Sequence, residues 1–135
     1  MTRLLVNETI PVRTEPDIPL VRQLVRERAT ELGFGILDLT KIVTAASELG
    51  RNTLVHGGGG TMRLETFVED ERRVVRLTFE DQGPGIPNLE QAMTDGFSTR
   101  GGMGLGLGGA KRLVNEFEVV SRVGEGTRVT VTRWR

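Results

Sequence analysis

The chain has 135 residues, enough for one domain with a hydrophobic core, and 37% of them are hydrophobic and 27% charged. Its 18 basic and 18 acidic side chains cancel, so the basic excess that is typical of a nucleic-acid-binding protein is absent. There is no cysteine, which excludes disulfides, thiolate catalysis and cysteine-ligated metal.

The N-terminal apolar run is too short for a signal peptide, and Glu8 follows it closely. No apolar run approaches the roughly 20 residues that a transmembrane helix needs. Repeats and linkers are also lacking. We therefore expect residues 1–135 to form a single domain of a cytoplasmic protein, with neither a membrane nor a nucleic acid as its partner.

The first half of the chain predicts a strand followed by two helices. The strand covers residues 4–12. Asp17 is expected to be the N-cap of a helix that ends at Gly33. A second helix is expected to begin at Asp38 and to stop near Gly57. The first helix carries an apolar stripe of Ile18, Leu20, Val21, Leu24, Val25, Ala29 and Leu32.

The second half predicts two hairpins around a long irregular stretch. Alternation in residues 61–69 and 75–79 predicts two strands with a turn at Glu71. A short helix is expected near residues 88–93, and the spacing of Ala110, Leu113, Val114 and Phe117 predicts another. Strands at 118–123 and 127–133 complete an α+β sandwich of two layers, with a mixed, mostly antiparallel sheet and helices on one face.

Glu48 and Asn52 lie four residues apart on the second helix, and therefore on the same face one turn apart. A carboxylate and a carboxamide there could serve a hydrated Mg²⁺, because that ion takes oxygen ligands and keeps several waters. The alternative is a solvent-facing polar pair.

Asp81 is in phase with Leu77 and Phe79, so the alternation of the strand points its carboxylate toward the core. A buried charge is costly unless a partner satisfies it. The partner could be an N–H donor of a ligand, such as an adenine amino group. It could equally be the backbone N–H groups of the turn that follows.

Glycines at positions 101–109 open directly into the helix expected from Ala110, a place where backbone N–H groups and the helix dipole favour phosphate. The alternative is a flexible hinge. Gly104, Gly106 and Gly109 match G-x-G-x-x-G, but no strand precedes them directly, as a dinucleotide fold requires. The P-loop motif and the ordinary protein-kinase motifs are absent as well.

These elements, in this order, resemble the GHKL superfamily of ATPases and kinases. Residues 48–52 with His56 are similar to its N box, residues 81–85 to its first glycine box and residues 101–109 to its second. Residues 81–113 more narrowly resemble the serine/threonine switch kinases of the RsbT type, relatives of the anti-sigma-factor kinase RsbW. We expect His56 to be a packed or capping residue rather than a metal ligand.

The resemblance implies ATP and Mg²⁺ as cofactors and a Bergerat-type pocket. Asn52 would hold Mg²⁺, Asp81 would accept a hydrogen bond from the adenine amino group, and Glu48 would be the catalytic base. Residues 88–103 would form a lid over ATP. The residues implied in nucleotide binding are Asn52, Asp81, Gly83, Gly85, Gly102, Gly104, Leu105, Gly106 and Thr127.

The same resemblance implies a protein serine/threonine kinase that phosphorylates STAS-domain proteins of the stressosome and then activates a downstream phosphatase. The alternative is an anti-sigma factor or switch module, in which ATP mainly decides which partner, such as a sigma factor, is held. A sensor histidine kinase would need a dimerisation helix with an acceptor histidine, and no segment of this sequence supplies one.

Overall fold

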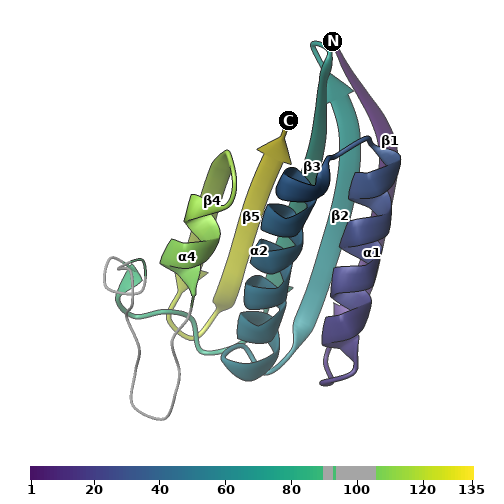
Figure 1. Cartoon of the computed structure of the whole chain (residues 1–135). Coiled ribbons are helices and arrows are strands. Elements are labelled where there is room, and N and C mark those ends of the chain that lie inside the picture. The colour runs from purple at the N-terminus through teal and green to yellow at the C-terminus, as the bar shows by residue number, and fades with distance from the viewer. Residues whose placement is uncertain (90–92, 94–105) are drawn as a thin grey trace.

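The computed structural model describes residues 1–89, 93 and 106–135 of the chain (Figure 1). Its elements in chain order are β1 (Thr2–Val12), α1 (Asp17–Glu31), α2 (Ile36–Val55), β2 (Gly60–Glu69), β3 (Arg72–Asp81), α4 (Leu107–Arg112), β4 (Glu116–Arg122) and β5 (Gly126–Trp134).

Within the described residues, five strands form one sheet in the order β1-β2-β3-β5-β4, and helices α1, α2 and α4 cover one face of it (Figure 1). The predicted two-layer α+β sandwich is thus confirmed. All four strand pairings within the described residues are antiparallel, so the expectation of some parallel pairing was wrong. No helix in the described part of the chain is long and apolar enough to cross a membrane.

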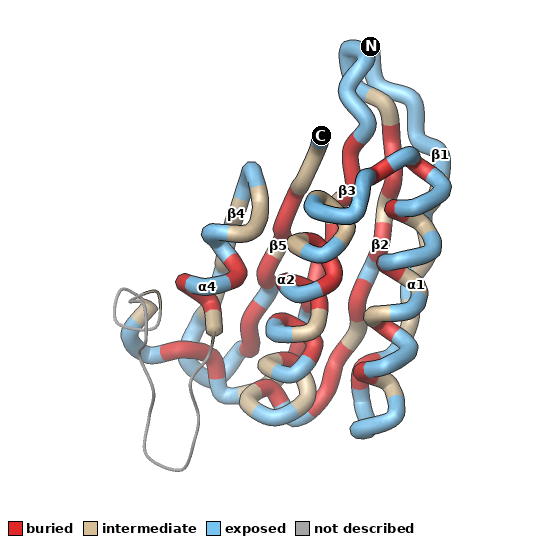
Figure 2. Tube along the Cα trace, in the orientation of Figure 1, coloured by how far each residue is buried: buried red, intermediate tan, exposed pale blue. Residues whose placement is uncertain are grey.

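The core lies between the sheet and the helices, where the buried stretches of both layers face each other (Figure 2). Each fully buried aliphatic side chain contributes about 1.5–3 kcal/mol relative to an exposed one. The apolar stripe predicted for α1 is buried at Ile18, Val21, Val25, Ala29 and Leu32, but Leu20 is 54% exposed and faces outward.

Two helix starts differ from the prediction. Asp17 is not an N-cap: its carboxylate accepts hydrogen bonds from the backbone N–H groups of Arg13 (2.8 Å) and Thr14 (3.0 Å), in the turn before α1. These two bonds lower the pKa of the Asp17 carboxyl. Helix α2 begins at Ile36, ahead of Asp38, whose carboxylate instead pairs with the Arg133 guanidinium on β5.

The C-terminal elements also differ. Phe117 was expected at the end of a helix, but α4 stops at Arg112 and Phe117 belongs to β4. The chain joins the sheet at Asn115, whose N–H donates to the Thr132 carbonyl (2.9 Å). Strand pairing therefore overrides a helical spacing of apolar residues. A short helix was expected at residues 88–93. The Met93 N–H donates to the Leu89 carbonyl (2.9 Å), and residues 90–92 lie outside the described part of the chain.

Candidate functional site

A small cavity of about 20 Å³ lies where α2 meets the ends of β3 and β5. Its polar lining includes Asn52, Asp81 and Thr127, three residues that the sequence singled out. The full lining is Leu49, Asn52, Thr53, His56, Phe79, Asp81, Ile86, Leu107, Thr127 and Val129. The fold therefore brings the predicted adenine-site residues and the predicted metal ligand together.

Asp81 points inward, as its strand phase predicted, and is only 8% exposed. Its Oδ1 accepts a hydrogen bond from the Gly83 N–H (2.9 Å), so backbone capping by the turn does occur. An ionised carboxylate has about four acceptor sites, so this one bond leaves others for a ligand.

Gly57 packs directly on the Asp81 carboxylate, a contact that the sequence analysis did not identify. A Cβ on Gly57 would overlap the carboxylate group, and a Cβ on Gly83 would lie 2.7 Å from Gly57 Cα. Both positions therefore require glycine for space. The glycine run that begins at Gly57 was the only sign of a close contact in the sequence, and it did not show which residue Gly57 packs against.

The turn after Asp81 is held at successive backbone groups. The Pro84 carbonyl accepts from the Gly124 N–H (2.8 Å), and the Gly85 carbonyl lies 3.2 Å from His56 Nε2. The Ile86 N–H donates to Ser121 Oγ (2.7 Å). His56 is thus a packed residue that supports the turn, as expected, and the predicted Gly83–Gly85 segment lies between two cavity-lining residues, Asp81 and Ile86.

Thr127 is 8% exposed and lies opposite Asp81 in the β3–β5 pairing. Its Oγ1 is 2.9 Å from Ser121 Oγ on β4. Ser121 was not among the residues predicted from the sequence. The signal available was its alternation with Phe117 and Val119, which places it on the same face of β4 as those two less exposed residues.

Glu48 and Asn52 have different surroundings. Asn52 is half-buried and lines the cavity, whereas Glu48, one turn earlier on α2, is exposed. The Glu48 carboxylate lies beside Gly106, where an added Cβ would come 2.5 Å from Oε2. Gly106 directly precedes α4. The other predicted phosphate-site residues, Gly102, Gly104 and Leu105, lie outside the described residues.

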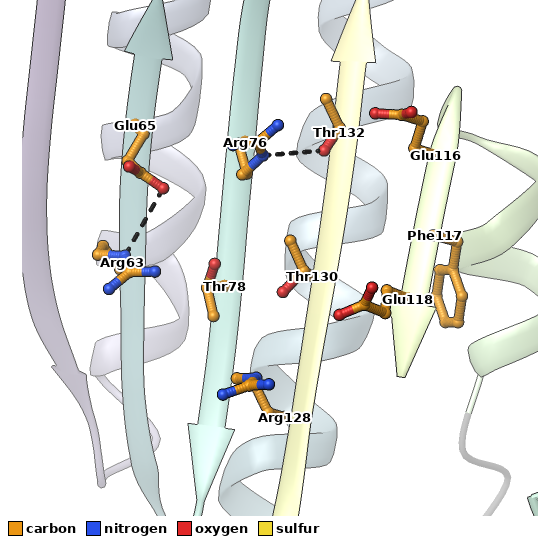
Figure 3. Close-up of a pocket in the computed structure, with 10 residues that line it drawn as sticks. All are labelled: Arg63, Glu65, Arg76, Thr78, Glu116, Phe117, Glu118, Arg128, Thr130 and Thr132. Atoms are coloured by element: carbon orange, nitrogen blue, oxygen red, sulfur yellow. Dashed lines mark hydrogen bonds and ion pairs between the residues drawn. The ribbon is translucent and has the colours of Figure 1, made fainter. Parts of the chain in front are cut away.

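A much larger hollow, of about 750 Å³, lies on the opposite face of the sheet (Figure 3). Three arginines, three glutamates and three threonines dominate its lining, which includes none of the predicted site residues. It is formed by Arg63, Glu65, Arg76, Thr78, Glu116, Phe117, Glu118, Arg128, Thr130 and Thr132, and we call it the open-face groove.

Residues 37–134 match the family model of histidine kinase-, DNA gyrase B- and HSP90-like ATPases. The chain belongs to this family. Serine/threonine-protein kinase RsbT of Bacillus subtilis (strain 168) is 46% identical over 125 residues, which cover 93% of this chain and 94% of that protein. An anti-sigma F factor of Bacillus thuringiensis (strain Al Hakam) is 33% identical over 104 residues, covering 72% of this chain and 70% of that protein.

Solved structures agree with this family assignment. The RsbU and RsbW domains of Rv1364c from Mycobacterium tuberculosis match with a TM-score of 0.66 and 25% identity over 96% of this chain, which spans 32% of that longer chain. The catalytic domain of histidine kinase ThkA matches with a TM-score of 0.53 and 20% identity, over 94% of this chain and 95% of that one, and supports the fold alone.

These findings confirm the predicted resemblance to the GHKL superfamily and to switch kinases of the RsbT type. The predicted enzyme class, a protein serine/threonine kinase that uses ATP, is confirmed with them. The roles of individual residues stay predictions.

Proposed function

We propose that residues 1–135 act as one kinase domain that transfers the γ-phosphoryl group of ATP, with Mg²⁺, to a serine or threonine of a STAS-domain protein. The pathway would be a cytoplasmic partner-switching system of the stressosome or sigma-factor type, with a phosphatase or a sigma factor downstream. The observation that carries this proposal is the 46% identity to RsbT over nearly the whole of both chains.

In this proposal Asp81 accepts a hydrogen bond from the adenine amino group and Thr127 supports it from the neighbouring strand. Gly83 and Gly85 let the backbone approach the nucleotide, and Gly102, Gly104, Leu105 and Gly106 present N–H groups to the phosphates. The cavity, at about 20 Å³, is far below the roughly 300–1,000 Å³ of ligand pockets, so ATP binding has to open it. Leu107, which enters the cavity from the short helix α4, is the side chain we expect to move.

The residues present fit a magnesium ion that is held mostly by the nucleotide. Within the described residues no three His, Cys, Asp or Glu side chains cluster to make a metal cage. Mg²⁺ in phosphoryl-transfer sites commonly takes only one or two protein oxygens beside phosphate and water. The carboxamide of Asn52, at the cavity wall, would supply one of them. When bound, the ion neutralises charge on the phosphates.

Glu48 is the proposed base. In the transfer, the bond from the γ-phosphorus to the ADP oxygen breaks and a bond to the acceptor oxygen forms, while the hydroxyl proton passes to the Glu48 carboxylate. The exposure of Glu48 leaves it accessible to a side chain of a partner protein, and its place beside Gly106 is near the predicted phosphate site. Positioning and charge neutralisation account for most of such catalysis.

The test is to incubate the protein with labelled ATP, Mg²⁺ and a STAS-domain protein encoded nearby in the same genome. We expect phosphoserine or phosphothreonine on that protein. Glu48→Ala should abolish labelling while keeping the Kd for ATP, and Glu27→Ala, at an exposed glutamate of α1, should retain both. Equal labelling by wild type and Glu48→Ala would contradict the proposed base.

A second function is favoured by the similarity to anti-sigma F factors, at 33% identity. The protein would then mainly sequester a partner, and bound ATP would decide which one. Clear ATP binding and a stable partner complex, without label on the partner, would support this function over the kinase.

A further inference from the structure

Three polar side chains form a row across adjacent strands at the cavity end of the sheet. Ser121 on β4 pairs with Thr127 on β5, and Thr127 pairs with Asp81 on β3. Thr127 and Asp81 line the cavity, whereas Ser121 lies behind Thr127 and is not part of the lining. Ser121 can therefore act on a ligand only through its neighbours.

The Ser121 hydroxyl has one proton and two lone pairs for three neighbouring groups. It accepts a hydrogen bond from the Ile86 N–H at 2.7 Å, so its proton goes either to Thr127 Oγ1, at 2.9 Å, or to the Gly126 carbonyl, at 3.3 Å. The Gly126 carbonyl can only accept, whereas in the Ser121–Thr127 bond either hydroxyl can be the donor.

The Ser121–Thr127 bond fixes where the Thr127 hydroxyl lies in the cavity wall. When Ser121 donates its proton to Gly126, Thr127 donates to Ser121 and keeps its lone pairs for a ligand; when Ser121 donates to Thr127, the Thr127 proton is free for a ligand. In both cases the Thr127 hydroxyl is held next to the Asp81 carboxylate, which sits opposite it in the strand pairing.

Ser121 also holds the turn that carries Gly83 and Gly85. Among the hydrogen bonds of the described residues, Ser121 is the one side chain that bonds both to this turn, at Ile86, and to Thr127. We propose that Ser121 is a positioning residue for nucleotide binding, which holds the Thr127 hydroxyl at the cavity and fixes the turn beside it. This inference rests on the proposed nucleotide site at Asp81.

The experiment compares wild type with Ser121→Ala by calorimetry with ATP and Mg²⁺, and by phosphotransfer kinetics. We expect the Kd and the KM for ATP to rise about 5- to 30-fold, as for the loss of one or two hydrogen bonds, while kcat at saturating ATP changes less than about twofold. Ser121→Thr, which keeps a hydroxyl, should restore the Kd to within about threefold of wild type. Thr130→Val removes a hydroxyl from the opposite face of the sheet and should leave the Kd unchanged.

A purely structural role would lower kcat and the melting temperature together and would not be relieved by Ser121→Thr, and this result would overturn the proposal. So would an unchanged Kd in Ser121→Ala when wild type binds ATP and Asp81→Asn does not. Absence of ATP binding by folded wild type would instead refute the proposed function itself. If Ser121→Ala does not fold, Ser121→Cys replaces it under the same criteria, because a thiol is only a weak donor.

Discussion

The two hollows of this molecule lie on opposite faces of one sheet and differ in nearly every property. The open-face groove is about 750 Å³ and the cavity at Asp81 about 20 Å³. In the groove, long side chains stand on a flat sheet, and its one ion pair within the described residues, Arg63–Glu65, is 3.6 Å long (Figure 3). In the cavity, backbone groups and short side chains are fixed by hydrogen bonds of 2.7–3.2 Å.

The larger hollow is therefore not the one that the predicted site residues line. The groove mixes Arg and Glu in equal number, so water and neighbouring charges satisfy its side chains. The cavity instead holds a nearly buried carboxylate against glycine backbone, an arrangement that costs free energy unless a partner uses it. The organised polar groups of the cavity, rather than its volume, are the reason why we place the proposed nucleotide site there.

Asp81→Asn should have the largest effect, because it removes the carboxylate charge from the cavity. Losing a hydrogen bond to a charged acceptor costs about 1.5–3 kcal/mol, so we expect the Kd for ATP to rise roughly 10- to 150-fold. Calorimetry with ATP measures this Kd. The matched control is Glu118→Gln in the open-face groove, the same change from carboxylate to amide, which should leave the Kd unaltered. Normal binding by Asp81→Asn would mean that the nucleotide pocket is assigned wrongly.

Adding side-chain volume tests how tightly each hollow is packed. Gly57→Ala forces a Cβ into the Asp81 carboxylate and should lower the free energy of unfolding by about 1–3 kcal/mol, as overpacking does. Thr130→Ile adds bulk within the open-face groove and should stay within about 0.5 kcal/mol of wild type. Urea unfolding measures both, and equal losses in the two variants would remove the contrast.

The smallest expected effect, on the melting temperature, concerns one ion pair on each face of the sheet. Glu8 on β1 accepts two hydrogen bonds of 3.0 Å from Arg28 on α1, and these bonds lower the pKa of the Glu8 carboxyl. A lowered folded-state pKa gives stability that is present above the unfolded pKa, about 4.3, and is lost as the pH falls through the folded value.

Glu8→Gln should therefore melt a few degrees below wild type at pH 7, and the gap should close as the pH falls below about 4. Melting curves across this range measure it. Glu65→Gln, which removes the 3.6 Å pair of the groove, should produce a smaller gap at pH 7. A gap that is independent of pH would show that the Glu8 charge contributes nothing.

Much of this architecture was predictable because local patterns and tertiary packing agree. Strand alternation correctly placed Asp81 and Thr127 on the inner face, since both are in phase with buried apolar residues such as Phe79 and Val129. The spacing of Glu48 and Asn52 put them on neighbouring turns of α2, but could not show that one lines the cavity while the other is exposed.

The features that the sequence did not predict depend on contacts between residues far apart in the chain or on different strands. Ser121 meets Thr127 because of the register of β4 on β5, and Gly57 lies against Gly83 in the turn after β3, and no local pattern encodes either contact. Phe117 had helical spacing, yet pairing with β5 decided its conformation. Asp17 had the residue type of an N-cap, but its carboxylate found N–H donors in the preceding turn.

Both chain ends lie at the same end of the sheet, away from the cavity (Figure 1). The Met1 ammonium bonds to Asp70 (2.8 Å) in the β2–β3 turn, and Trp134 pairs with Val74, whereas Asp81 and Thr127 end the ladder on the other side. A ten-residue strand spans roughly 30 Å. An affinity tag, a surface tether or a fused protein at either end would therefore leave the proposed nucleotide site unobstructed, so immobilised protein should report solution affinities.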